Sequence, residues 1–327
     1  MALSLKRGTV TAIGERHEGL VRCEVDGAPC VAYPRLTGPV ALGDDVIVNV
    51  QARQLELGSG GFDVLYANVT RGLDLAPDPR AHVMKLPYTP AQFAVWHVEE
   101  ELDLAETLGG LPVVCCSLHS QLVPAAAALA GLRVAYVQLA GGALPVPLSD
   151  AVRALREHGL VAATASVGAC FGGDVECVTA ASALAWARAA RHDAVVCAIG
   201  PGIVGTGSRL GHGGLAAAEV ANTSAALGGA PVLAVRVSGR DVRERHRGVS
   251  HHTRAVVELC LSEVTIAWPR GLEPPHWLRR RTDVDVEEWR EASAGLPLEH
   301  MGRGADDDPW FFASAFAAGK AARGLVR

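Results

Sequence analysis

Short runs of β-branched and other apolar residues, partly alternating with polar ones, fill the first 70 positions of the chain. They lie at residues 8–13, 20–25, 29–33, 46–50 and 64–67. Turn-forming residues such as Asp26-Gly27 separate them, and short strands at this spacing are typical of a small barrel or sandwich. We therefore predict a small, barrel-like β domain over residues 1–70 and a connecting segment over residues 71–110.

The pattern changes at about residue 111, where longer apolar runs begin to alternate with helix-like stretches. The runs centre on Val113, Val134, Ala163, Val195, Val232 and Thr265. Such runs are typical of strands buried on both faces in a parallel sheet, and the alternation favours right-handed βαβ units. Residues 111–327 are thus predicted to form an α/β domain, with a mainly parallel sheet and helices on both faces.

Residues that favour helix N-termini mark where several helices are expected to begin. Ser149 (or the next residue), Asp174 and a residue near Thr253 each open a helix-like stretch. Asp308-Pro309 combines an N-cap with a proline in the first turn. The aromatic residues by which this last helix should pack on the α/β domain are Trp310, Phe311, Phe312 and Phe316.

The composition suits a protein with a sizeable core and argues against some partners. Of the 327 residues, 49% are hydrophobic and 20% are charged, and the net charge is −5. An acidic balance gives no general attraction to nucleic acid or to anionic lipid. We expect neither a nucleic-acid nor a membrane partner, while self-association into a homo-oligomer stays open.

Two further features lead us to expect a cytoplasmic protein. The first ten residues lack the apolar segment of a secretory signal, and no apolar run of about 18 residues occurs. None of the eight cysteines forms a Cys-x-x-Cys pair, and several lie in apolar runs, as buried reduced thiols do.

The most unusual loop of the α/β domain follows the strand near Val195. It reads GPGIVGTGSRLGHGG over residues 200–214 and combines seven glycines with two hydroxyl groups. Ligands of open α/β sheets bind at the carboxyl ends of strands, and backbone N–H groups there can cradle an anion. The residues expected to bind the ligand are Gly202, Gly205, Thr206, Gly207 and Ser208.

A basic segment, residues 240–253, follows the strand near Val232. Four arginines and three histidines occur in its fourteen positions. We expect Arg247 to oppose the anion, together with His251 or His252 at a helix N-terminus. Two alternatives stay open. The segment is an ordinary solvated surface, or it holds a metal ion.

The metal alternative has a defined set of ligands. They would be His246, His251, His252 and Asp241. No recognised metal-binding spacing is present, so the expected site contains no metal, and the sequence leaves the cofactor unknown.

A third loop, residues 117–121, follows the strand near Val113 and contains His119. The loop either places His119 as a general acid or base, or simply caps a helix through Ser117 or Ser120. Because all three loops follow parallel strands, we predict that Gly202–Ser208, His119 and Arg247–His252 converge on one pocket.

Four strings carry a family resemblance that extends over nearly the whole chain. They are HVMKLPYTP (82–90), SLHSQL (117–122), GPGIVGTGSRLGHGG (200–214) and HRGVSHHT (246–253). In these strings the chain resembles a bacterial family of Gram-positive and actinobacterial species, the domain of unknown function numbered thirty-eight sixty-six. The resemblance implies a full-length member of that family, and it adds no catalytic residue.

The leading functional hypothesis is an enzyme that acts on a small anionic metabolite. His119, His251 or His252 would transfer protons, and the sequence does not decide between a hydrolase and a transferase. A ligand sensor or scaffold that turns nothing over is the first alternative. The second is an NADP-dependent oxidoreductase with Arg240 on the 2′-phosphate, which rests on a formal G-x-G-x-x-G match at residues 200–205.

Overall fold

The structure is a computed structural model that describes residues 3–56 and 60–326. The chain divides into two compact units, Met1–Trp96 and His97–Arg327. The division falls inside the segment expected to connect the two domains. Much of that segment belongs to the first unit, where β6 (Val83–Lys85) and β7 (Phe93–Val95) form an antiparallel hairpin.

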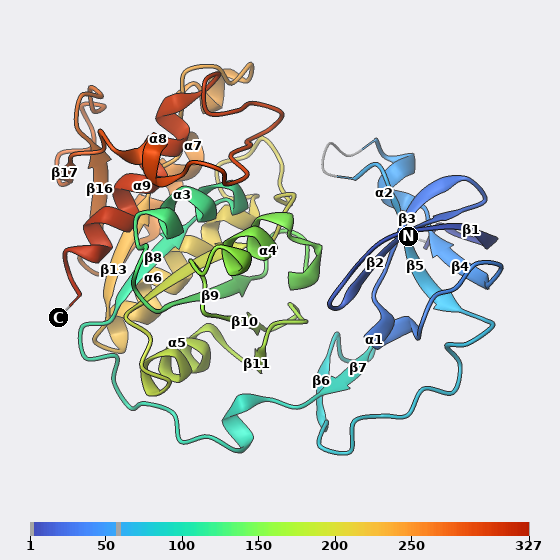
Figure 1. The fold of residues 1–327 in the computed structure, drawn as a ribbon. Coiled ribbons are helices and arrows are strands. Elements are labelled where there is room, and N and C mark those ends of the chain that lie inside the picture. Colours follow the sequence, from blue (N-terminus) through green and yellow to red (C-terminus); the bar gives the residue numbers. More distant parts are fainter. Residues whose placement is uncertain (1–2, 57–59, 327) are drawn as a thin grey trace. The chain divides into compact units, whose positions relative to one another are not determined.

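Five strands of the first unit close into a barrel in the order β1-β2-β3-β5-β4 (Figure 1). They are β1 (Leu5–His17), β2 (Leu20–Val25), β3 (Ala28–Ala32), β4 (Asp45–Asn49) and β5 (Asp63–Asn68). Two short helices, α1 (Pro34–Thr37) and α2 (Gln51–Gln54), lie between them along the chain. Val21, Cys23 and Val25 alternate into the barrel core, as the pleat of a strand requires. The predicted barrel-like domain is confirmed.

The second unit contains an eight-stranded sheet in the order β11-β10-β9-β12-β8-β13-β16-β17, and every neighbouring pair is parallel. The strands are β8 (Pro112–Cys116), β9 (Val134–Leu139), β10 (Ala163–Val167), β11 (Val175–Cys177), β12 (Ala194–Ile199), β13 (Ala230–Ala234), β16 (Thr265–Pro269) and β17 (Thr282–Val284). The central strands β8, β9 and β12 are buried along their whole length. The predicted parallel α/β sheet is confirmed, with a strand at each of the six expected positions.

Helices cover both faces of this sheet. One face carries α3 (Leu122–Ala127), α4 (Asp150–Glu157), α8 (Trp289–Ala292) and α9 (Pro309–Arg323). The other carries α5 (Ala180–Ala189), α6 (Ala216–Ala226) and α7 (His251–Leu259). As expected, α9 packs through Phe311, Phe312 and Phe316, which are buried in the core, while Trp310 is partly buried against it. In the described part of the chain, none of the helices is long and apolar enough to cross a bilayer.

One expected helix start is wrong. Asp174 precedes the short strand β11, and α5 begins instead after Thr179, whose hydroxyl accepts a hydrogen bond from the Ser182 amide. The Asp174 carboxylate accepts from the amide and the hydroxyl of Thr164, so it is not available to cap a helix. The expected cap at Ser149 is confirmed, because its side chain accepts from a backbone amide at the start of α4.

The strand order creates a topological switch point at the carboxyl edge of the sheet. From β8 the chain passes to α3 on one face, whereas from the neighbouring strands β12 and β13 it passes to α6 and α7 on the other. Adjacent loops therefore diverge above β8, the arrangement in which open α/β sheets bind their ligands.

Candidate functional site

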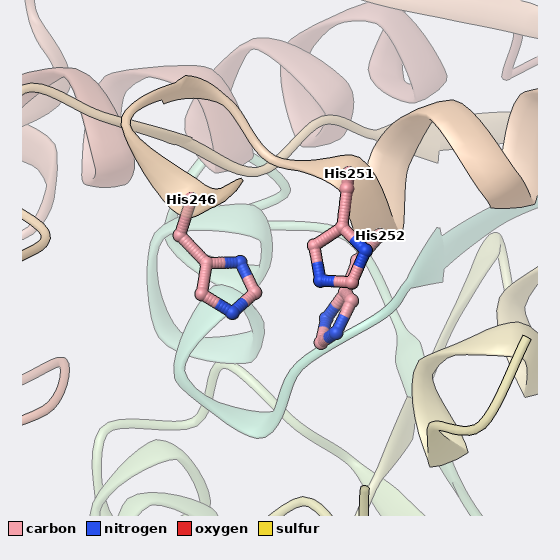
Figure 2. Close-up of side chains that lie close together, drawn as sticks. All are labelled: His246, His251 and His252. Carbon is pink, nitrogen blue, oxygen red and sulfur yellow. The ribbon is translucent and has the colours of Figure 1, made fainter. Parts of the chain in front are cut away.

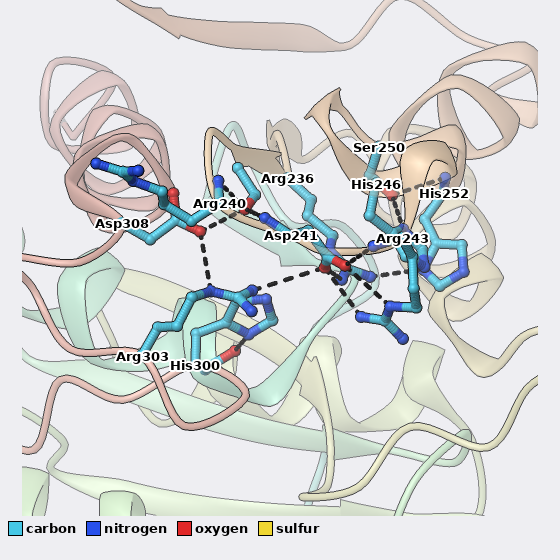
Figure 3. A network of polar contacts seen from close by, with 12 residues as sticks. Arg236, Arg240, Asp241, Arg243, His246, Ser250, His252, His300, Arg303 and Asp308 are labelled. Carbon is cyan, nitrogen blue, oxygen red and sulfur yellow. Dashed lines mark hydrogen bonds and ion pairs between the residues drawn. The ribbon is translucent and has the colours of Figure 1, made fainter.

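Polar side chains gather at the carboxyl end of β13 (Figure 3). The chain turns back on itself there, because β14 (Val237–Ser238) pairs with β15 (Gly248–Val249). The segment between β13 and α7 ends at Ser250. The Ser250 hydroxyl accepts a hydrogen bond from the His252 amide and so caps the N-terminus of α7. Further residues come from the segment that precedes α9. We call the following residues the polar cluster: Arg236, Asp241, Arg243, His246, His252, His300, Arg303 and Asp308.

Arg236 is the most deeply buried charge of the polar cluster, at 0% exposure. Its Nη2 lies 3.1 Å from Oδ2 of Asp241, and Arg243 donates two hydrogen bonds of 2.9 Å to the same carboxylate. Burial alone would raise the pKa of Asp241, but these two guanidinium groups hold it well below its usual range. Burial lowers the pKa of Arg236 to about 10, so the guanidinium stays charged at neutral pH.

A second buried carboxylate, Asp308, lies at the opposite end of the polar cluster. It accepts a hydrogen bond of 3.0 Å from the Gly239 amide and a short one from the Ser238 hydroxyl. Arg303 lies between the carboxylates, with Nε 3.3 Å from Asp308 and Nη2 3.6 Å from Asp241. The three arginines of the polar cluster thus face two carboxylates, which leaves an excess of one positive charge.

Three histidines converge beside these charges (Figure 2). His246 ends the short 3-10 helix η5 (Glu244–His246), and His251 and His252 begin α7. One ring nitrogen of each lies within 4.8 Å of those of the other two. Nδ1 of His246 is 2.8 Å from the hydroxyl of Ser250, and Nδ1 of His252 is 3.3 Å from Nη1 of Arg236. We call His246, His251 and His252 the histidine triad.

The histidine triad is neutral at physiological pH. Burial, reinforced by neighbouring positive charges, lowers the pKa of His246 to about 3 and that of His252 to about 2. The same causes lower the pKa of His251, whose side chain is only partly buried. A neutral imidazole offers one lone pair and one N–H group, so it can bind a metal ion, donate a hydrogen bond or accept one.

His212 links the loop after β12 to the histidine triad. Its ring stacks on that of His252, with centroids 3.6 Å apart. Its Nε2 lies 3.1 Å from the Arg209 carbonyl, to which it must donate, so the proton of the neutral ring is on Nε2. Within the described ranges, the buried Nδ1 of His212 has no hydrogen-bond partner.

Most of the chain matches one family model. A family model described as "Protein of unknown function (DUF3866)" matches residues 29–319. The chain belongs to the DUF3866 family. The resemblance inferred from the sequence strings is thereby confirmed at the level of the family. A comparison with curated proteins found no match. Membership of the DUF3866 family brings no activity with it, so the chemistry has to be inferred from the site.

In this DUF3866 protein, the glycine-rich loop folds as a narrow hairpin and not as an open cradle. Gly205 and His212 form an antiparallel bridge, and the Thr206 amide donates to the Gly211 carbonyl. The Ser208 amide donates to the Thr206 hydroxyl, so both amides are used inside the loop. Residues 204–210 are exposed. The binding roles expected for Gly202, Gly205, Thr206, Gly207 and Ser208 stay predictions.

Two glycines of this loop are required by close packing. A Cβ atom at Gly200 would lie 2.0 Å from the Ala143 carbonyl oxygen, and one at Gly213 would lie 2.0 Å from that of Gly141. The helix α6 begins only at Ala216, so the G-x-G-x-x-G match does not lead directly into a helix. A dinucleotide-binding fingerprint needs a glycine-rich loop that leads directly into a helix, so the geometry does not favour a dinucleotide site here.

The glycine-rich loop and the basic segment do lie side by side. Arg209 forms an ion pair with Glu258 of α7, and a Cβ atom at Gly207 would lie 3.9 Å from Cζ of Arg245. Arg247 itself is exposed, whereas Arg236, from the end of the preceding strand, is buried. A role of Arg247 in ligand binding stays a prediction.

His119 lies at the switch point with both ring nitrogens engaged. Its Nδ1 is 3.1 Å from the carbonyl of Ile199, the last residue of β12, and its Nε2 is 2.6 Å from the Ser149 hydroxyl. Burial lowers its pKa to about 4. These bonds join three loops of the carboxyl edge, which makes His119 a positioning residue in this conformation.

Sequence reasoning missed four residues of the polar cluster. They are Arg236, His300, Arg303 and Asp308. Arg236 left a usable signal, because it is a lone charge inside the apolar run 230–237. The sequence predicts Asp308 only as the N-cap of the last helix, but its side chain makes no capping hydrogen bond and instead accepts from Ser238 and Gly239. His300 and Arg303 lie in a polar segment with no periodicity, and nothing in the sequence indicates that they reach the sheet edge.

Proposed function

We propose that the polar cluster binds a small anionic molecule that carries a phosphate or carboxylate group. The observation that supports this is the excess of one positive charge at the switch point, where Arg236 is 0% exposed and Arg243 and Arg303 are partly exposed. A charge buried without a partner is costly, and an anion of the right size would neutralise it.

The donors of the polar cluster fit such a ligand. In the part of the chain described, Nε of Arg236 has no hydrogen-bond partner. Arg243 is 35% exposed and Arg303 is 17% exposed in their side chains, so solvent reaches both. Guanidinium groups bind carboxylate and phosphate oxygens through pairs of parallel N–H bonds, which makes arginine the suited residue for this ligand class.

Whether the bound anion also reacts depends on the histidines. His251 is the better candidate for proton transfer, because it is partly exposed and its Nε2 has no hydrogen-bond partner among the described residues. His252 adjoins it, whereas His119 is held at both nitrogens. A hydrolase or transferase would use these groups, and a sensor would need only the arginines.

Thermal unfolding with inorganic phosphate and with citrate tests the proposal. An anion at a hundredfold excess over its dissociation constant should stabilise the native state by about 2.7 kcal/mol. Arg243→Ala should abolish the stabilisation, since it removes the excess charge while Arg236 and Arg303 still face Asp241.

Arg247→Ala tests the polar cluster against the alternative expected from the sequence, in which Arg247 binds the anion, because Arg247 lies in the same segment and is exposed. It should keep the full effect of the anion. Loss of binding in Arg247→Ala alone would place the ligand on the exposed loop instead, and no stabilisation by either anion would contradict the proposal.

A further inference from the structure

We propose that the histidine triad, His246, His251 and His252, is a binding site for a transition-metal ion of the zinc class. Figure 2 shows the three rings turned toward one another, and one nitrogen of each lies within 4.8 Å of the others. The inference rests on this geometry, although His246 and His252 also belong to the polar cluster proposed to bind an anion.

The separation of the nitrogens is close to what a metal ion needs. Zinc binds imidazole nitrogen at about 2.0–2.1 Å in tetrahedral geometry, which places ligand nitrogens roughly 3.4 Å apart. The ring centroids of the triad are 4.9, 4.8 and 4.5 Å apart in the three pairs. The side chains must therefore rotate for the three nitrogens to approach one another to binding distance.

The donor set selects the class of ion. Three neutral imidazoles suit Zn²⁺, Co²⁺, Ni²⁺ or Cu²⁺, whereas Mg²⁺ and Ca²⁺ need mainly oxygen ligands. Three protein ligands leave a fourth position open, which is the arrangement of catalytic zinc sites. An anion or a water molecule could fill that position.

The surroundings of two histidines fit ligation. Nδ1 of His246 is held by the Ser250 hydroxyl at 2.8 Å, the kind of outer contact that orients a metal-binding imidazole. Nε2 of His251 is buried and, in the described ranges, without a hydrogen-bond partner. A buried ring nitrogen without a hydrogen-bond partner is unusual in a native structure, and coordination to a bound metal ion would explain it.

The positive charge of Arg236 opposes the binding of a metal ion at the histidine triad. Its charge lies next to His252 and repels a cation. The contact between Nη1 of Arg236 and Nδ1 of His252, at 3.3 Å, is longer than an ordinary hydrogen bond, so the ring can turn away while Arg236 keeps its ion pair with Asp241. An anion in the fourth position would offset the remaining repulsion.

Titration of the chelator-treated full chain with Co²⁺ alone, in a buffer free of phosphate and citrate, tests the site. We expect one Co²⁺ per chain and the intense visible absorption of a tetrahedral complex, which Zn²⁺ should then displace. His251→Gln and His246→Gln should each weaken Co²⁺ binding about tenfold or more, since even changes to outer-shell partners commonly cost that much.

His158→Gln is the control, because His158 is an exposed histidine at the end of α4. His158→Gln and Arg243→Ala should both keep full Co²⁺ affinity. Because Arg243→Ala should abolish anion binding only, failure of the anion proposal and failure of the metal proposal remain distinguishable. His251 is partly exposed, and circular dichroism should show its variant folded even where the buried His246 variant is not. An octahedral spectrum, or equal affinity in His251→Gln and His158→Gln, would overturn the inference.

Discussion

The imidazole ring of His212 stacks on that of His252, with the centroids 3.6 Å apart and the planes inclined by 18°. Two positively charged rings would repel each other at this separation, so the stack is disfavoured when both rings are protonated to imidazolium. Burial and then the neighbouring His212 lower the pKa of His252 to about 2. The stack therefore joins the loop after β12 to the start of α7 while at least one of the two rings is neutral.

His300 should make the fold sensitive to acid. Burial, then Arg236, Arg303 and Arg243, lower its pKa to about 3, although Asp241 opposes them. In the unfolded chain its pKa is about 6.5, so its contribution to stability is complete above that pH and is lost as the pH falls toward 3. Urea unfolding over this range should show a shallower dependence on pH for His300→Gln, by about 1.4 kcal/mol per pH unit. Equal slopes would mean that His300 already titrates normally in the folded protein.

Asp241→Asn should strongly destabilise the second unit. The change leaves Arg236, at 0% exposure, without an anionic partner and increases the repulsion among three guanidinium groups. Breaking a buried ion pair from one side commonly costs about 3–5 kcal/mol in the free energy of unfolding. Asp306→Asn is the control, because Asp306 is 95% exposed and its loss should cost about 0.5 kcal/mol or less. Similar denaturation midpoints for both variants would contradict the structure of the polar cluster.

Gly213→Ala should be poorly tolerated. Its added methyl group would lie 2.0 Å from the backbone oxygen of Gly141, and neither backbone can move without disturbing the loops of the carboxyl edge. Overpacking of this kind commonly costs about 1–3 kcal/mol. Gly239→Ala makes the same chemical change where no atom lies within 4 Å, and it should leave the thermal midpoint nearly unchanged.

Asp44→Ala should destabilise the barrel of the first unit. The buried carboxylate accepts hydrogen bonds from Asn68 at 2.8 Å, from the Ala41 amide at 2.9 Å and from Arg71 at 2.7 Å. Removing it leaves these donors unpaired, at a cost of about 3 kcal/mol. Asp45→Ala should change the stability far less, because the pair of Asp45 with Arg7 lies at the surface and is screened by solvent. Amide hydrogen exchange in β4 and β5 would reveal the difference, and equal protection in the two variants would refute it.

The sheet could be predicted from the sequence because its strands are buried on both faces and are therefore apolar throughout, as Val195 and its neighbours in β12 are. Asp174 shows the limit of local signals. Aspartate is a favoured N-cap residue, but the carboxylate of Asp174 accepts hydrogen bonds from the amide and the hydroxyl of Thr164 on the neighbouring strand. A tertiary partner thus replaced the local one.

The candidate site was less predictable than the fold. The glycines at positions 200–214 suggested a cradle for an anion, yet Gly200 and Gly213 are glycine because carbonyl oxygens of another loop leave no room for a side chain. The sequence favours Arg247, which precedes a helix, whereas Arg236 lies inside an apolar run. Which of two arginines is buried depends on the β14–β15 pairing, and a two-residue strand leaves no periodic pattern.

The two halves of the polar cluster are made at different times during translation. Arg236 and Asp241 leave the ribosome early, whereas Arg303 and Asp308 follow only after β16 and β17 have been synthesised. Until the later segment arrives, Ser238 and the Gly239 amide lack their acceptor on Asp308, and this edge of the nascent sheet stays hydrated. A nascent chain therefore cannot form the complete charge arrangement until the segment that precedes α9 has been synthesised.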